Sequence, residues 1–283
     1  MRVWRRATIW WYGAVRLDDI RGFVFDVDGT LVQRAGAELN VIPGAPEVLE
    51  RIHASGRPYA LFTNGSHVAP TAFARELRSA GLPVEDEQVL TPLCSVQTYL
   101  DRFRDGAQIL PFLTEPARAF LEAAGVRLVD GGNGAHVDAV FVAHTDRADF
   151  DQLERAAHAV IGGARLLTGS YVRAYAGANG PILSRGAMIT AAIAKASGAR
   201  PVVVGKPSRA AVRELERRLG VRAADVAVVG DDVLLDVALG HLGGSRTVLV
   251  RTGITGARDL GGLPERRRPH ASVDTVAELL AWL

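Results

Sequence analysis

Short runs of apolar residues alternate along this chain with segments that have helical periodicity. The run Phe23-Val24-Phe25 predicts a strand buried on both faces, as in a parallel sheet. Further strands are predicted within 58–66 and at 107–113, 137–143, 164–167, 201–204, 226–229 and 247–250, and helices at 45–55, 69–81, 115–124, 150–161, 187–196, 209–219 and 273–283. Residues 32–46 are expected to form a loop. Strands that alternate with helices indicate an α/β fold with a Rossmann-like parallel sheet and right-handed crossovers.

The middle of the chain differs from its two ends. Its strand–helix units are separated by polar, glycine-rich loops at 130–134 and 176–180. We therefore expect an inserted α/β domain with its own core over residues 86–199. The ends, 17–85 and 200–283, would together form the main core, and residues 1–16 would form an N-terminal extension.

Composition and charge exclude several classes of protein. The net charge of +2 over 283 residues gives no indication of nucleic-acid binding. The single cysteine, Cys94, excludes an internal disulfide framework, and a reducing, cytoplasmic location is the default. Residues 1–17 resemble a signal peptide superficially, but their apolar run contains Trp10, Trp11 and Tyr12 and is too short to span a membrane. We expect a soluble protein without membrane association.

Polar residues that could carry chemistry follow several of the predicted buried strands. They are Asp26 and Asp28, Thr63 with Asn64, Lys206, Asp231, and Asp236 one helical turn later. Parallel sheets bind ligands at the carboxyl ends of their strands, so we expect these residues at one edge of one sheet. Converging carboxylates suit Mg²⁺, and a hydroxyl with a lysine ammonium beside it suits a phosphate. One carboxylate could then attack phosphorus while a second transfers protons.

Each of these residues also has a purely structural interpretation. Asp28 fits an Asp-Gly turn, and Thr63-Asn64-Gly65 fits a turn that ends a strand. Lys206 could be an ordinary solvated cation, although it is one of only two lysines, with Lys195, among 33 basic residues. Asp231 and Asp232 could cap the following helix. Because all of these features would fall at the same edge of one sheet, we favour a functional site.

The order of these motifs resembles the haloacid dehalogenase (HAD) superfamily of phosphohydrolases. The motifs are Asp-x-Asp-Gly-Thr at 26–30, Thr-Asn at 63–64, Lys206, and Gly-Asp-x-x-x-x-Asp at 230–236. The stretches 42–45, 63–66, 205–207 and 252–253 are similar to the NagD-like subfamily, and the insertion looks like its large C2-type cap.

The resemblance implies a role for each motif residue. Asp26 would be the nucleophile and Asp28 the general acid and base, while Thr63, Asn64 and Lys206 would hold the phosphoryl group. Mg²⁺ would be bound by Asp26, the backbone carbonyl of Asp28, and Asp231. Asp236 would support these ligands without binding the metal directly. An aspartate at position 28 also argues against a dehalogenase, which needs no such acid.

The predicted cap departs from the pattern of related proteins. In related proteins a cap strand ends in Thr-Asn followed by an acidic residue, but here the corresponding residues are Leu167-Thr168-Gly169-Ser170-Tyr171. Residues 183–186 replace the Pro-Gly that precedes the last cap helix in related proteins. Tyr171, Arg173 and Arg185 are candidates for substrate contact, with an exposed cap loop as the alternative. Among the seven histidines only His144 lies near a predicted cap strand end, where we expect a structural role.

The sequence thus predicts a Mg²⁺-dependent phosphatase of a small phosphorylated metabolite. A sugar phosphate, a glycerol- or glycolate-type phosphate, or a nucleoside monophosphate would each fit. The alternatives are a phosphotransferase or mutase and a non-catalytic binding protein on the same scaffold. Similar proteins often dimerise through the cap, so a homodimer is a further expectation.

Overall fold

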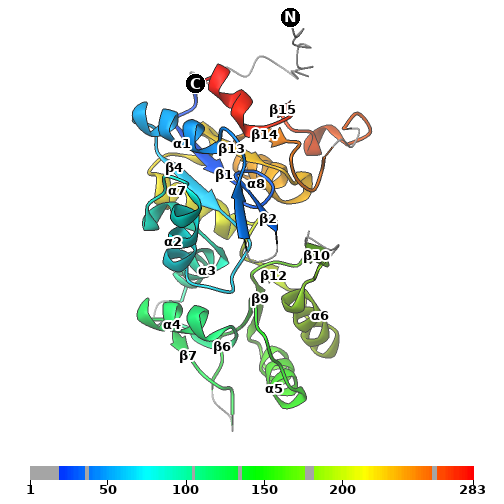
Figure 1. The fold of residues 1–283 in the computed structure, drawn as a ribbon. Coiled ribbons are helices and arrows are strands. Elements are labelled where there is room, and N and C mark those ends of the chain that lie inside the picture. The colour runs from blue at the N-terminus through cyan, green and yellow to red at the C-terminus, as the bar shows by residue number, and fades with distance from the viewer. Residues whose placement is uncertain (1–18, 36–37, 104–105, 133–135, 176–181, 257–259) are drawn as a thin grey trace, which may run out of the picture. The chain divides into compact units, whose positions relative to one another are not determined.

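The structure is a computed structural model that describes residues 19–35, 38–103, 106–132, 136–175, 182–256 and 260–283 (Figure 1). The predicted N-terminal extension lies outside the described residues, as do parts of the loops predicted at 130–134 and 176–180. Within the described part of the chain, no helix has the length and apolar character needed to cross a membrane.

The described residues form two compact units. The first contains the chain up to Phe62, together with Ala74–Gln88 and Leu215–Leu283; the second contains Thr63–Phe73 and Val89–Glu214. The segments 63–73 and 200–214, which the sequence analysis assigns to the main core, thus group with the second unit by their contacts. The predicted domain boundaries stay a prediction.

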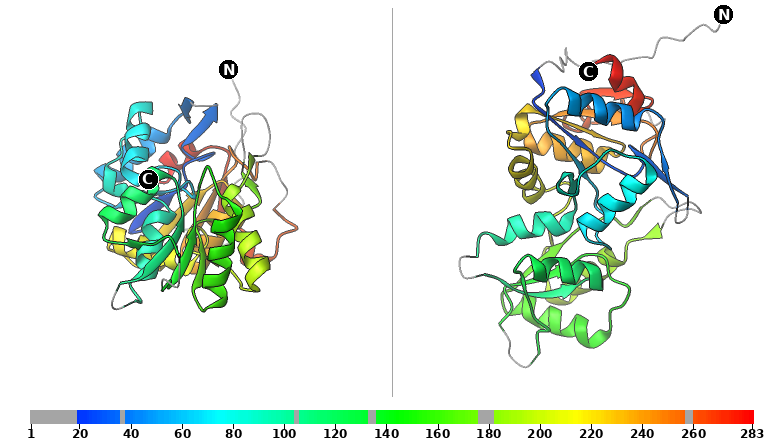
Figure 2. Two further views of the ribbon diagram at one scale, coloured as in Figure 1. Left: turned by 90° about the horizontal axis from the view of Figure 1, so that it is seen from below. Right: turned by 60° about the vertical axis from the view of Figure 1, so that its left-hand side comes forward.

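The first unit is built on a parallel sheet with β1 near its centre. Its strands are β1 (Gly22–Phe25), β4 (Tyr59–Phe62), β13 (Val226–Gly230), β14 (Arg246–Val250) and β15 (Ala271–Val273), in the order β15-β14-β13-β1-β4. All four residues of β1 are buried, as the run Phe23-Val24-Phe25 predicts. The α/β fold with parallel sheets is therefore confirmed, and Figures 1 and 2 show helices covering these strands.

Helices of the first unit use apolar stripes to cover the sheet. The described helices with residues in this unit are α1 (Ala45–Ala54), α2 (Pro70–Ala80), α7 (Arg209–Leu219) and α8 (Ala238–Gly243), with short 3₁₀ turns at Asp86–Gln88, Ala223–Asp225, Glu265–Arg267 and Val276–Ala281. Helix α1 buries Val48, Leu49 and Ile52 at helical spacing and packs against β4. Its start is set by Gly44, whose φ of 88° favours glycine. Ser208 caps α7 as predicted, because its Oγ accepts the Ala211 N–H at 3.0 Å.

Two predictions for the first unit are wrong. The loop expected at 32–46 contains an antiparallel hairpin of β2 (Val32–Ala35) and β3 (Glu38–Val41), in which apolar and polar residues alternate weakly. The terminal α-helix expected at 273–283 is instead β15 followed by a 3₁₀ helix over Val276–Ala281. Val276 and Leu279 are the buried residues of that helix, and their spacing of three matches the 3₁₀ repeat.

The second unit has its own parallel sheet. Its strands are β6 (Gln108–Phe112), β7 (Arg127–Leu128), β8 (Ala139–Val142), β9 (Arg165–Thr168) and β12 (Val202–Val203), in the order β12-β9-β8-β6-β7. Its helices are α3 (Pro92–Leu100), α4 (Glu115–Ala123), α5 (Phe150–Ile161) and α6 (Arg185–Ser197), and it also contains β5 (Val89–Leu90) and a hairpin of β10 (Ala174–Tyr175) and β11 (Ile182–Leu183).

Strand β8 shows how this sheet is buried on both faces. Ala139 and Phe141 pack into a cluster with residues of α3 and α4, whereas Val140 and Val142 pack into a cluster with residues of α5 and α6. Successive side chains of a strand point to opposite faces, so a continuous apolar run is what a strand between two helical layers requires. Figure 1 shows α4 on one side of this sheet and α5 and α6 on the other.

Strand β12 corrects the sequence analysis in a way that concerns Lys206. The run 201–204 was expected beside the strands that carry Asp26 and Asp231, but β12 pairs with β9 in the sheet of the second unit. An apolar run of this length fits any buried sheet, so its composition cannot select between two of them. Helix α3 is an element that the sequence analysis missed, although Thr91 followed by Pro92 is an N-cap signal.

A half-buried histidine in the first unit, His270, links the stability of the protein to pH. Nδ1 of His270 accepts the backbone N–H of Thr247 at 3.1 Å and lies 2.8 Å from Thr247 Oγ1. Burial lowers the pKa of His270 below 6.5, and the charges of His241 and Arg246 lower it further. The folded protein therefore favours the neutral form of this ring more than the unfolded chain does.

We expect the free energy of unfolding to fall as the pH drops below about 6.5, because the unfolded chain then binds a proton that folded His270 resists. Above that pH the contribution is fully present. Urea unfolding at a series of pH values should show a shallower acid loss for His270→Asn, which keeps an acceptor and cannot titrate. His53→Asn, a change at an exposed histidine, should keep the wild-type slope. Parallel profiles for wild type and His270→Asn would contradict this assignment.

Candidate active site

The ends of β1 and β13 bring two aspartates together. The two strands are parallel neighbours, with Phe25 opposite Val229, and the N–H of Asp26 continues the ladder to the Val229 carbonyl at 2.8 Å. Asp26 is the first residue after β1, and Asp231 is the first residue after β13. Because parallel strands end at the same edge, both carboxylates emerge there.

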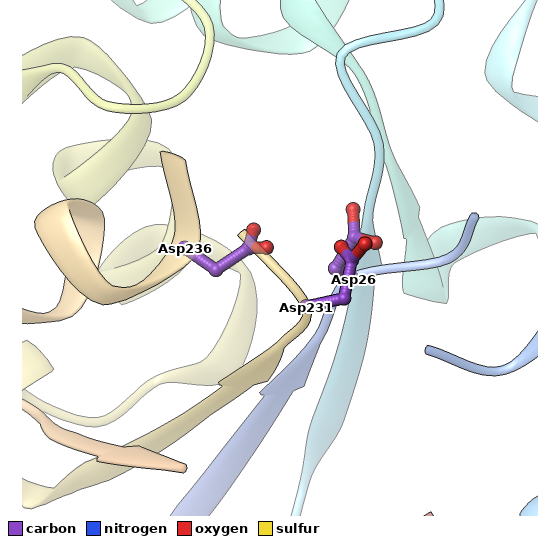
Figure 3. Close-up of side chains that lie close together, drawn as sticks. All are labelled: Asp26, Asp231 and Asp236. Atoms are coloured by element: carbon purple, nitrogen blue, oxygen red, sulfur yellow. The ribbon is translucent and has the colours of Figure 1, made fainter. Parts of the chain in front are cut away.

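A third carboxylate reaches the same place from a π-helical turn at Val233–Val237. Asp236 lies on this turn, and one carboxylate oxygen from each of Asp26, Asp231 and Asp236 lies within 4.8 Å of the other two (Figure 3). We call these three residues the acidic cluster. The side chains are almost fully buried, with exposed fractions of 9%, 6% and 2%. Single π-turns are frequent at functional sites, where they reposition a side chain.

The electrostatics of the acidic cluster favour a bound cation. Burying a carboxylate is costly, and three carboxylates at this separation repel one another unless positive charge intervenes. Oxygen ligands of this kind are those that Mg²⁺ prefers. The residues present therefore fit a magnesium ion, as the sequence analysis expects.

Hydrogen bonds fix the orientation of the cluster. Oδ2 of Asp231 accepts the backbone N–H of Ile254 at 2.6 Å, and Oδ2 of Asp236 accepts that of Asp232 at 3.1 Å. The hydroxyl of Thr30 lies 3.4 Å from Asp26 Oδ2. A Cβ on Gly253 would collide with the Asp231 carboxylate, so this position requires glycine. The sequence analysis did not assign Ile254 or Thr30 a role in the site, although Thr30 ends the motif at 26–30 and Ile254 follows the stretch 252–253.

The structure separates the two interpretations of the Asp231-Asp232 pair. Oδ1 of Asp232 accepts the Leu234 N–H at 2.7 Å, which is the capping role proposed for both residues. Asp231 instead faces the acidic cluster. Adjacent aspartates thus have different tasks, one structural and one in the site.

Asp28 lies beside the cluster but outside it. Its side chain is 44% exposed, and its Oδ1 accepts the Arg34 Nε–H at 2.8 Å. Asp28 also forms a β-bridge with Val32 at the base of the β2–β3 hairpin. An exposed carboxylate two residues after a buried one is suited to exchanging protons with solvent or substrate.

The predicted phosphate-binding residues belong to the second unit. Asn64 holds the main chain of Lys206 from both sides, since its Oδ1 accepts the Lys206 N–H at 2.8 Å and its Nδ2 donates to the Lys206 carbonyl at 2.9 Å. Both Thr63 and Lys206 are buried, with exposed fractions of 5% and 2%. The structure therefore joins Asn64 and Lys206, while the joint action of these residues with the acidic cluster stays a prediction.

Two of the three candidate substrate contacts of the predicted cap, Arg173 and Arg185, interact with other residues of the second unit. Arg185 Nη1 forms an ion pair with Asp146 Oδ1 at 3.2 Å, and His144 Nε2 lies 3.6 Å from the same oxygen. Tyr171 is exposed, and the carbonyl of Arg173 accepts the N–H of Ser184. The predicted substrate role of Tyr171, Arg173 and Arg185 stays a prediction.

Comparison with known proteins agrees with this geometry. A family profile described as haloacid dehalogenase-like hydrolase matches residues 23–127, and a second, described as HAD-hydrolase-like, matches residues 203–279. Mouse chronophin is 30% identical over 281 residues, which covers 94% of each chain. The chain belongs to the HAD-like hydrolases. The resemblance stated from the motifs is thereby confirmed.

Individual relatives show to which group of HAD-like hydrolases this chain belongs. The ribonucleotide monophosphatase NagD of Escherichia coli K12 is 28% identical and covers 92% of this chain and 98% of its own. The solved structure of a p-nitrophenyl phosphatase from Archaeoglobus fulgidus superimposes with a TM-score of 0.82 at 29% identity, over 94% of this chain and all of the other. This chain is a NagD-like HAD phosphatase, that is, a phosphoric monoester hydrolase.

Proposed function

We propose that the protein hydrolyses a small phosphomonoester with Mg²⁺ through an aspartyl-phosphate on Asp26. The observation that carries this proposal is the acidic cluster, in which three buried carboxylates converge at the ends of β1 and β13. A surface turn would not bury them, and a protein that only binds phosphate has no need of so much negative charge at one point.

In the proposed first step, a carboxylate oxygen of Asp26 attacks phosphorus, and the bond from phosphorus to the ester oxygen breaks. Asp28 gives its proton to the departing oxygen, which leaves as an alcohol. In the second step, Asp28 removes a proton from water, the water oxygen attacks phosphorus, and the bond to Asp26 breaks. Inorganic phosphate and the original Asp26 carboxylate result.

The proposed metal ligands are Asp26, Asp231 and the backbone carbonyl of Asp28, with Asp236 supporting them. When bound, Mg²⁺ would offset the charge of the cluster and of the phosphoryl oxygens, so that an anionic nucleophile can approach an anionic ester. The hydrogen bonds from Ile254 and Asp232 orient Asp231 and Asp236 for this task.

Thr63 and Lys206 are the proposed phosphoryl-binding residues. A lysine ammonium and a threonine hydroxyl supply donors to phosphate oxygens, and a buried ammonium suits an anionic ligand. We assign Asn64 the role of holding Lys206, because the oxygen of its side-chain amide accepts the Lys206 N–H and the nitrogen donates to the Lys206 carbonyl.

Names of the relatives suggest the range of substrates. They include a 5'-nucleotidase of Bacillus subtilis, a dihydroxyacetone phosphatase of Corynebacterium glutamicum and an acid sugar phosphatase of Staphylococcus aureus. We propose a small phosphorylated metabolite as the substrate, with Tyr171, Arg173 and Arg185 as its contacts in the cap. We also propose a cytoplasmic enzyme, with no nucleic-acid or membrane partner, that forms a homodimer through the cap.

The proposal predicts phosphate release from p-nitrophenyl phosphate by the purified protein when Mg²⁺ is present. Because the cluster needs a cation, activity should fall to background in EDTA and return when Mg²⁺ is added in excess. Release without any added acceptor would also exclude an obligatory phosphotransferase or mutase. Protein that binds Mg²⁺ but releases no phosphate across a broad panel of phosphomonoesters would instead indicate a non-catalytic binding protein.

A further inference from the structure

Arg34 touches Asp28, a proposed catalytic residue of the first unit, and the hydrolysis steps above give this arginine no task. It lies in β2, opposite Leu39 of β3, and its Nε donates to Asp28 Oδ1 at 2.8 Å. The exposed fractions of the Arg34 and Asp28 side chains are 34% and 44%. A ligand that approaches Asp28 can therefore reach Arg34 as well.

The backbone that carries Arg34 is tied to the site. The Gly29 N–H donates to the Val32 carbonyl at 2.7 Å, and the Val32 N–H donates to the Val27 carbonyl at 3.0 Å. These bonds join the start of β2 to the turn that contains Asp28. The register of Arg34 relative to Asp28 is therefore fixed by main-chain hydrogen bonds.

A second tie joins this turn to the loop that follows β14. Thr252 Oγ1 donates to the Gly29 carbonyl at 2.5 Å, and Gln33 Nε2 lies 3.4 Å from the Thr252 carbonyl. The same loop supplies the Ile254 N–H to Asp231. Arg34 therefore stands on backbone that is tied both to the Asp28 turn and to the loop that orients Asp231, and a fixed position of this kind is a requirement for selective contact with a ligand.

The proposed proton transfer determines which part of the substrate lies beside Asp28 during the reaction. Asp28 protonates the departing oxygen, so the carbon skeleton bonded to that oxygen must lie next to Asp28. A guanidinium in this place attracts an anion, and its planar donors match a carboxylate or a phosphate better than they match hydroxyls. A neutral alcohol would offer the Arg34 guanidinium no negative charge to attract.

We infer that Arg34 selects phosphomonoesters whose leaving group carries its own negative charge, such as a carboxylate a few bonds from the ester oxygen. This inference rests on the proposed function, because it uses the assignment of Asp28 to the leaving-group side. Arg34 acts as a specificity residue: it contacts the leaving group and takes no part in breaking the phosphorus–oxygen bond.

The test compares 3-phosphoglycerate with glycerol 3-phosphate, which differ by a carboxylate in place of a hydroxymethyl group. Wild type should show a higher kcat/KM for 3-phosphoglycerate, and Arg34→Gln should lower that value about tenfold or more, as expected for a lost charge-assisted hydrogen bond. The value for glycerol 3-phosphate should fall by less than about threefold, since a neutral leaving group gains little from Arg34. Arg34→Lys should give an intermediate result, because a point charge keeps the attraction without the paired donors.

Arg51→Gln is the matched control, since it removes one positive charge from an exposed position on α1. It should preserve the wild-type preference. Equal losses on both substrates in Arg34→Gln would overturn the inference and reduce Arg34 to a structural partner of Asp28. A wild type that hydrolyses p-nitrophenyl phosphate but does not prefer 3-phosphoglycerate would overturn it too. A failure of the proposed function would look different, because wild type would then release phosphate from none of the three compounds.

Discussion

Asp26→Asn is expected to lower phosphate release by at least about 10³-fold, the scale seen when a covalent nucleophile is removed. The amide is nearly isosteric with the carboxylate but is a poor nucleophile, so the aspartyl-phosphate does not form. Release from p-nitrophenyl phosphate in saturating Mg²⁺ measures the loss. Acid-quenched protein from a labelled substrate should carry phosphate in wild type and not in the variant.

The control for this substitution is Asp274→Asn, which makes the same change at an exposed aspartate of the first unit. It should retain wild-type turnover. Thermal unfolding of Asp26→Asn should remain cooperative, which separates a chemical loss from a failure to fold. Equal phosphate release by wild type and Asp26→Asn would show that Asp26 is not the nucleophile.

Asp231→Asn is expected to remove most of the stabilisation that Mg²⁺ gives to the folded protein. A ligand at 100 times its dissociation constant adds about 2.7 kcal/mol to the free energy of unfolding, which corresponds to a rise of several degrees in Tm. The variant loses one of the charged oxygens of the acidic cluster, while its amide oxygen can still accept the Ile254 N–H. Its Tm in Mg²⁺ should therefore stay close to its Tm in EDTA.

Unfolding scans in EDTA and over a series of Mg²⁺ concentrations measure this effect without any assay of activity. Asp101→Asn, at an exposed position where α3 ends, should respond to Mg²⁺ as wild type does. If Asp231→Asn kept the full metal-dependent rise in Tm, Asp231 would have to be removed from the proposed ligands.

The acidic cluster was predictable because its position depends on short-range information. The residue that follows a buried parallel strand lies at the edge of the sheet where ligands bind. The positions of Asp26 and Asp231 can therefore be predicted from the ends of two apolar runs. Asp236 follows from a spacing of about one helical turn. The π-helical form of that turn was not predictable, because it depends on the Val237 N–H reaching the Asp232 carbonyl.

Lys206 shows where the same reasoning stops. Its strand is apolar and ends in a polar turn, as β1 and β13 do, yet it pairs with β9 in a different sheet. Strand partners depend on contacts between distant parts of the chain, and composition does not encode them directly. Arg34 was missed for a related reason, since the hairpin that positions it alternates only weakly and was taken as a loop.

The two hydrogen bonds between the Asn64 side chain and the Lys206 main chain have a consequence for the chemical ageing of the enzyme. Asparagine is among the thermolabile residues, and here a glycine follows it. Deamidation of Asn64, in which water supplies an oxygen and ammonia leaves, would place a carboxylate oxygen against the Lys206 carbonyl, where Nδ2 now donates at 2.9 Å. Two acceptors would then face each other, and Lys206 would lose its support. Stored enzyme would lose activity by this route while its acidic cluster stayed intact.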